Sequence, residues 1–109
     1  MTLKVYRLVS SDPPAPEDFV PAGPEAKGAS PDDPKRYCEY FGLSVIADPK
    51  GFKSAKKLVK SMDRNLMIAC GTITPESGVV AHTPRNIRPT HYTWWVYEEV
   101  SPHTLFKVV

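Results

Sequence analysis

Two histidines and two arginines lie close together in the second half of the chain. The stretch runs from His82 to His91 and contains Arg85 and Arg88. Imidazole groups serve as general acid and base near neutral pH, and guanidinium groups bind phosphate oxygens. The stretch therefore fits the site of a small ribonuclease, with the two arginines as phosphate-binding residues. Its prolines, Pro84 and Pro89, favour a plain surface loop in which neither histidine is catalytic.

Metal binding is the next candidate chemistry, and the spacing does not favour it. His82, His91 and His103 would supply three nitrogens, but no His-x-His or HExxH motif holds them together. Cys38 and Cys70 are far apart and form no CxxC pair, so they cannot form a zinc site alone. We expect no bound metal and, in a reducing compartment, two free thiols rather than a disulfide.

Arg7 stands inside an otherwise apolar strand pattern. It shares one side of the segment with Leu3, Val5 and Val9, because alternate strand residues face the same way. If that side is the core face, the guanidinium points inward and needs a partner, for which phosphate or carboxylate is the best planar match. If it is the solvent face, Arg7 needs no such partner.

Trp94 and Trp95 are neighbours in a second strand pattern. Adjacent strand residues point to opposite faces, so the two rings cannot both face one environment. Large aromatic side chains usually fill the core of a small domain. Both readings stay open here: either the rings are simply core, or one of them forms an exposed wall for a base or a nicotinamide ring.

A long proline-rich segment separates Arg7 from the other candidate residues. The chain has 109 residues, enough for one domain, and 12 prolines, seven of which fall in residues 10–36. Proline breaks helix interiors and central strands, which excludes a helical bundle along the whole chain. We expect residues 10–36 to form one long loop that Phe19 and Val20 hold against the body.

Apolar patterns predict about six strands and one helix, which must position these residues. The strands are expected at residues 3–9, 40–47, 66–73, 79–81, 92–97 and 105–109. Asp48 and Pro49 are typical of a helix start. The apolar side of the helix that follows would consist of Phe52, Ala55, Leu58, Val59 and Met62. This order predicts a single α+β domain, a mostly antiparallel sheet or pair of sheets with one amphipathic helix packed against it.

Charge is distributed unevenly along the chain. Residues 1–49 hold five Lys or Arg and eight Asp or Glu, a balance of −3, whereas residues 50–109 hold nine and four, a balance of +5. The polar side of the predicted helix would carry the basic stripe Lys53, Lys56, Lys57 and Lys60. This stripe is either a solvated outer face or a docking surface for an acidic protein or RNA, which would make the chain a non-catalytic interaction module of the inhibitor or immunity type.

Targeting signals are not evident in the sequence. No segment stays apolar over the roughly 18 residues that a membrane-spanning helix needs, and the N-terminal residues show no signal-peptide pattern. We therefore expect a cytoplasmic protein that has no membrane partner.

The segment 42–48, Gly-Leu-Ser-Val-Ile-Ala-Asp, is followed shortly by Lys-Ser-Ala at 53–55. The pair resembles the ADP-ribosyltransferase fold of the poly-ADP-ribose polymerase and diphtheria-toxin type, in which a Gly-Ile-Tyr-Phe-Ala-Asp strand leads into a Lys-Ser-Ala helix. The apolar strands that follow keep the family's order. The resemblance implies a domain that binds NAD or an ADP-ribose-containing nucleotide and transfers ADP-ribose to a macromolecule, with NAD as substrate.

The resemblance also implies site residues in this chain. Arg7 and Ser44 stand where the family holds the nicotinamide-ribose end of NAD, and His91 joins them as a candidate catalytic residue. Tyr6, Trp94 and Trp95 would line the nucleotide, and the proline-rich loop would flank the cleft as a lid. The family's glutamate, which binds the ribose 2′-hydroxyl, should fall near Thr93 or His91, and neither is an acid.

Overall fold

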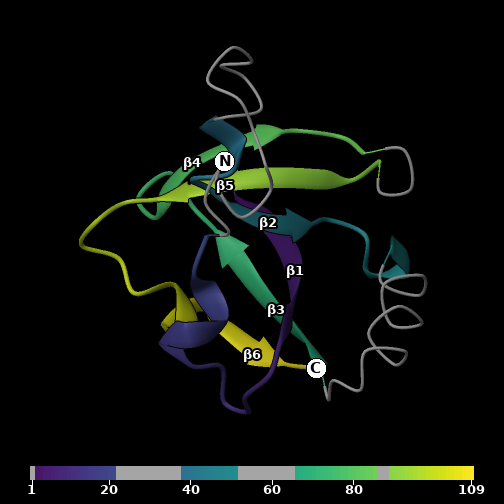
Figure 1. The fold of residues 1–109 in the computed structure, drawn as a ribbon, viewed down its shortest axis with the longest axis vertical. Helices are drawn as coiled ribbons and strands as arrows, with labels where there is room; N and C mark the ends of the chain where they lie inside the picture. The colour runs from purple at the N-terminus through teal and green to yellow at the C-terminus, as the bar shows by residue number, and fades with distance from the viewer. Residues whose placement is uncertain (1, 22–37, 52–65, 86–88) are drawn as a thin grey trace.

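The computed structural model describes residues 2–21, 38–51, 66–85 and 89–109 of the chain, which form a strongly curved antiparallel sheet (Figure 1). Its strands are β1 (Leu3–Val9), β2 (Leu43–Ile46), β3 (Met67–Ile73), β4 (Gly78–His82), β5 (His91–Val96) and β6 (Phe106–Val108). Three 3-10 turns accompany them: η1 (Pro16–Phe19), η3 (Pro49–Gly51) and η4 (Pro102–Leu105).

The strands are ordered β4-β5-β2-β1-β3-β6, and every neighbouring pair is antiparallel. β1 and β3 pair along their whole length, from Leu3 opposite Ile73 to Val9 opposite Met67. β1 and β2, in contrast, are in register only where Tyr6 faces Ile46. The sheet is therefore nearly split between β2 and β1, and the two parts run in different directions in Figure 1.

The curvature lets the sheet cover its own apolar face. Trp94 of β5 and Phe106 of β6 belong to opposite parts of the sheet, yet their ring centroids are 6.0 Å apart. The buried cluster around them draws residues from five strands and from the loop after β1. Its members are Val5, Val9, Phe19, Leu43, Val45, Ala69, Ile73, Trp94 and Phe106.

The expected α+β class is wrong for the part of the chain that the structure describes. There the regular elements are six strands and short 3-10 turns, so the protein is mostly antiparallel sheet. The physical reason is the curvature, because among the described residues two parts of one sheet face each other and enclose the main core with no helix between them. The predicted helix from Phe52 onward, together with the basic stripe Lys53, Lys56, Lys57 and Lys60, lies outside the described residues.

The predicted strands all exist, with small differences in their ends. The largest difference is at β2, which was expected from Tyr40 but begins at Leu43. The backbone N–H groups of Phe41 and Gly42 donate to the carbonyls of Cys38 and Glu39, at 3.1 Å each. These bonds close a turn, so residues 40–42 cannot pair with a neighbouring strand.

Phe19 holds the beginning of the proline-rich loop against the body, as expected. Phe19 is buried in the main core and contacts the Phe106 ring, with centroids 5.1 Å apart. Val20, expected to accompany it, is 64% exposed. The loop beyond residue 21 lies outside the described residues until residue 38.

Candidate functional site

Arg7 lies on the core face of β1, the inward alternative of the two left open by its sequence. Its Nη1 donates to the Ser44 carbonyl oxygen at 2.6 Å, and its Nε donates to the Asp18 carbonyl oxygen at 3.0 Å. Its guanidinium carbon also lies 5.6 Å from the centre of the Phe19 ring. The side chain thus bridges the split between β1 and β2 and ties the first loop to both strands.

The charge of Arg7 is only partly compensated. Burial lowers the pKa of Arg7 from its ordinary value, and the negative charge of Asp18 opposes that change. The Asp18 carboxylate itself accepts from the Ser10 N–H, the Ser10 hydroxyl and the Ala15 N–H, at 2.8, 2.8 and 2.9 Å. Burial alone would raise the pKa of Asp18, but these hydrogen bonds favour the carboxylate and lower it.

Ser44 and the two β5 residues expected near it lie on one face of the sheet. β2 and β5 place Ser44 directly opposite Thr93 and Ile46 opposite His91. Directly opposite residues of an antiparallel pair share a face, and so do residues two apart on one strand. Ser44 is exposed, whereas His91 and Thr93 are buried beneath other polar groups.

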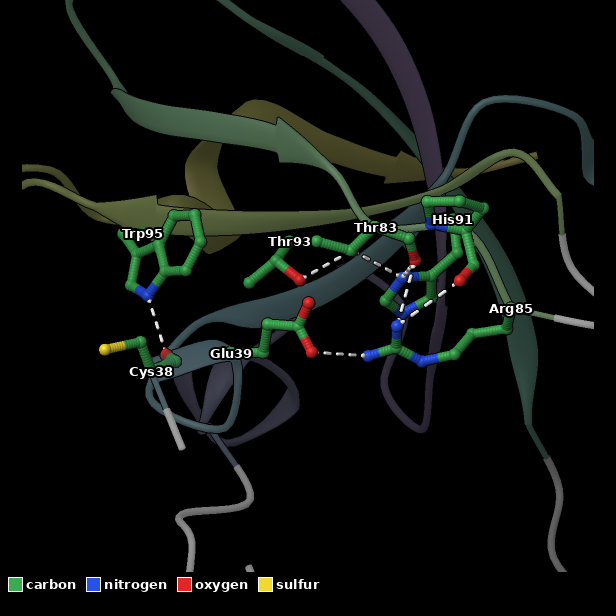
Figure 2. A network of polar contacts seen from close by, with 8 residues as sticks. Cys38, Glu39, Thr83, Arg85, His91, Thr93 and Trp95 are labelled. Carbon is green, nitrogen blue, oxygen red and sulfur yellow. Dashed lines mark hydrogen bonds and ion pairs between the residues drawn. The ribbon is translucent and has the colours of Figure 1, made fainter. Parts of the chain in front are cut away.

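Those polar groups form the hydrogen-bonded network in Figure 2. The Thr83 hydroxyl lies 2.8 Å from the Thr93 hydroxyl and 2.9 Å from Nδ1 of His91. The same Nδ1 is 2.8 Å from the Thr83 carbonyl oxygen. A carbonyl oxygen only accepts hydrogen bonds, so we place a proton on Nδ1.

A buried ion pair completes the network. Arg85 Nη2 lies 3.2 Å from Glu39 Oε2, and Arg85 Nη1 donates to the Thr83 carbonyl oxygen at 3.1 Å. The side chain of Glu39 is only 5% exposed, against 32% for Arg85. Figure 2 shows the Glu39 carboxylate between Thr93 and Arg85. Because Glu39 holds Arg85, the phosphate-binding role expected for Arg85 would require this ion pair to open.

The turn before β2 positions Glu39. Trp95 Nε1 donates to the Cys38 carbonyl oxygen at 3.0 Å, which fixes the turn to β5. Gly42 lies so close to β5 that a Cβ there would overlap the Thr93 methyl group and lie 3.3 Å from the Trp94 carbonyl oxygen. The absence of a side chain at Gly42 therefore allows the turn to cover Thr93.

The two histidines expected as an acid–base pair are not brought together. His82 faces Tyr92, and the centroids of the two rings are 4.9 Å apart. His91 is the neighbour of Tyr92 on β5, so it points to the opposite face of the sheet. Nε2 of His82 instead lies 2.8 Å from the Pro89 carbonyl oxygen.

The residues expected to line a nucleotide are scattered. Trp94 is fully buried in the core, where it offers no ring face to a ligand, and Trp95 is half-buried against the turn before β2. Tyr6 is on the opposite face of β1 from Arg7 and packs near Ile46. Arg88 lies outside the described residues.

Glu39 and Thr83 were missed by the sequence analysis. Glu39 lies in Tyr-Cys-Glu-Tyr, at the end of the proline-rich segment, and Thr83 directly follows a short strand. Neither stretch carries a motif that predicts a buried polar residue. Only the tertiary contacts with Arg85 and His91 single them out.

Other features concern metals, thiols and membranes. In the ranges that the structure describes, no cluster of three or more His, Cys, Asp or Glu side chains is arranged to hold a metal ion. Cys38 and Cys70 are both free thiols, as expected. Within the described residues, no helix has the length and the apolar character needed to cross a membrane.

Comparison of the chain with protein-family models, curated proteins and solved structures gives no match.

Proposed function

We propose that the chain is an ADP-ribosyltransferase-like domain that binds NAD or an ADP-ribose-containing nucleotide. The observation that carries this proposal is the order of the strands. The resemblance assigns the site to the first strand, to the Gly-Leu-Ser strand and to the strand of Thr93. These are β1, β2 and β5, and they are neighbours in the sheet, in the order β5-β2-β1, although they are far apart in the sequence.

The arrangement around these strands suits the nicotinamide-ribose end of NAD. Arg7 bonds to the Ser44 backbone from the core face of the sheet, whereas the exposed Ser44 side chain lies on the other face, opposite Thr93. The exposed Ser44 hydroxyl is able to donate to a nucleotide or accept from it. We assign Ser44 to contacting the nucleotide and Arg7, through its bond to the Ser44 backbone, to positioning Ser44.

Transfer of ADP-ribose breaks the bond between ribose C1′ and the nicotinamide nitrogen, and positive charge develops on the ribose. A fixed carboxylate stabilises such a charge, and removing one electrostatic contact of this kind commonly costs about a hundredfold or more in rate. The resemblance places the acid near Thr93 or His91. We propose that Glu39 supplies it, because Glu39 pairs with Arg85, Arg85 bonds to the Thr83 carbonyl oxygen, and the Thr83 hydroxyl bonds to Thr93. A ribose hydroxyl would then compete with Arg85 for Glu39.

Calorimetric titration with NAD and with ADP-ribose tests the binding. We expect heat of binding with the wild-type protein and a loss of affinity of about tenfold or more in Arg7→Lys, which keeps the charge but not the planar guanidinium. Lys107→Ala is the control, because Lys107 is exposed on β6 at the far edge of the sheet. No heat with the wild type at millimolar nucleotide would overturn the proposal.

A second variant guards against loss of folding at Arg7. Ser44 is exposed, so Ser44→Glu leaves the core intact and places a negative charge where the nucleotide phosphates would approach. Thermal unfolding of each variant without ligand reports whether it is folded. Weak binding by a folded Ser44→Glu supports the site, and unchanged binding contradicts it.

The other functions considered for the sequence gain no support from the geometry. The basic stripe for an acidic protein or RNA partner lies outside the described residues. A ribonuclease that uses His82 and His91 as a pair would need both side chains on one face, and the register of β4 and β5 separates them. A cytoplasmic location remains part of the proposal, supported by the two free thiols.

A further inference from the structure

The two edges of the sheet differ in how they are protected. β6 has three residues, with the charged and exposed Lys107 at its centre, and short or charged strands discourage pairing with other chains. β4 has five residues, Gly-Val-Val-Ala-His, without a proline or an acidic, lysine or arginine side chain. β4 thus carries none of these protective features. Figure 1 shows it at the outer margin, beside β5.

The hydrogen bonds of β4 show which of its backbone groups face outward. The Thr83 N–H donates to the His91 carbonyl oxygen at 3.0 Å, and the Tyr97 N–H donates to the Ser77 carbonyl oxygen at 3.3 Å. In an antiparallel pair such bonded positions alternate. Between them, Val79 and Ala81 therefore point their N–H and C=O groups toward β5. The residues that point these groups away from β5 are Gly78, Val80 and His82.

We propose that β4 is the interface of a homodimer, in which the β4 strands of two copies pair antiparallel across a two-fold axis at Val80. This inference goes beyond the proposed function and does not depend on it. In a two-fold interface each residue faces its own symmetry counterpart or a reciprocal partner. The outward groups of Val80 would bond to Val80 of the second copy. Gly78 is buried in the single chain, so its pairing with His82 of the second copy would require the groups that bury it to move.

The side chains along β4 are suited to this pairing. Gly78 would lie opposite the largest side chain of the strand, His82, so the imidazole meets no Cβ. On the other face of the sheet, Val79 would lie opposite Ala81 of the second copy. Val79 is 52% exposed in the single chain, and the pairing would cover it with apolar neighbours. No charged pair is buried anywhere along the strand, so no desolvation of charge opposes association.

The mass of the protein in solution tests the proposal. Sedimentation equilibrium is expected to give twice the 12.1 kDa chain mass at high concentration, with dissociation on dilution. Val79→Lys should raise the dissociation constant by about tenfold or more, because two lysines would then meet an uncharged strand. Thr72→Lys is the matched control, an exposed substitution on β3, away from β4. A wild type that stays monomeric up to millimolar concentration overturns the proposal.

Amide hydrogen exchange locates the interface within the dimer. We expect slow exchange at Val80 and His82 in the wild type and fast exchange in Val79→Lys. The amides of Val79 and Ala81 bond to β5, so they should stay slow in both proteins and show that β4 is folded. A dimer that Val79→Lys leaves intact, or in which Val80 exchanges fast, places the interface elsewhere and contradicts the proposal.

Discussion

Glu39 and Arg85 form an ion pair whose members differ strongly in exposure. The Glu39 side chain is almost fully buried, whereas about a third of the Arg85 side chain reaches solvent. Burying a carboxylate is costly unless a cation and hydrogen bonds compensate it. The pair therefore depends more on Arg85 than on Glu39, because a released guanidinium can turn to water and a released carboxylate cannot.

Removing Arg85 and removing Glu39 should therefore lower the free energy of unfolding by different amounts. We expect Arg85→Met to lower the free energy of unfolding by about 3 kcal/mol, because it leaves the Glu39 charge buried without a partner. Glu39→Gln should cost only about 1 kcal/mol, since the amide oxygen still accepts from Arg85. Urea denaturation of both variants measures the difference. Equal costs would show that Arg85 cannot reach solvent once Glu39 is neutral.

The Glu39→Gln variant also distinguishes a structural role of Glu39 from its proposed catalytic role. If Glu39 serves only to hold the turn before β2, Glu39→Gln changes stability and leaves nucleotide binding and transfer alone. If it stabilises charge on the ribose, the transfer rate falls while NAD affinity stays close to that of the wild type. Arg7 has a structural role in any case, because two of its donors bond to backbone carbonyls.

The loop after β1 is the element that anchors Arg7. η1 begins at Pro16, and the Asp18 carboxylate accepts the Ala15 N–H, so the turn is closed at its first residue. Phe19 at its end enters the core beside Phe106 and lies against the Arg7 guanidinium. The loop therefore adds a side chain to the main core and a carbonyl acceptor to Arg7.

Adjacent residues of this loop offer a matched pair of substitutions. Phe19→Ala should lower the free energy of unfolding by about 3 kcal/mol or more, because it leaves a cavity in the main core. Val20→Ala, one residue later and 64% exposed, should change it by less than about 0.5 kcal/mol. Chemical denaturation monitored by circular dichroism measures both. Similar small effects would show that the loop is not part of the cooperative core.

At the scale of the whole molecule, one core joins the two parts of a nearly split sheet. β1 and β2 share a single registered pair, so backbone bonding between the two parts is weak. The buried cluster around Trp94 crosses the split and includes Val5 of β1 and Leu43 of β2. Side-chain packing, more than the β1–β2 ladder, therefore holds the two parts together.

This arrangement predicts a single unfolding transition. Trp94 is fully buried between the two parts, so its fluorescence reports their separation, whereas far-UV circular dichroism reports the strands. We expect the two signals to change at the same urea concentration, because neither part retains a complete core alone. A fluorescence transition that precedes the loss of strand signal would mean that the parts separate before they unfold.

The positions of the strands were predictable from the sequence, and the class of the fold was not. Apolar and β-branched runs placed all six strands, and the alternation of Leu3, Val5 and Val9 put Arg7 in phase with apolar residues. The expectation of α+β came from the helical spacing of Phe52, Ala55, Leu58, Val59 and Met62, which lie outside the described residues. The described residues form a sheet whose curvature lets Trp94 meet Phe106, and no local pattern encodes curvature of this kind.

The sequence by itself determined where strands form, because strand formation depends on side chains a few residues apart. It also determined that Arg7 and Ser44 belong to the first two strands. The tertiary structure decided that β1, β2 and β5 are neighbours and that Arg7 bridges the split between β1 and β2. It also brought Glu39 to the network of Thr83, Arg85 and His91. Such contacts join residues that are distant along the chain and so depend on strand order and curvature, which arise only when the whole sheet packs on itself.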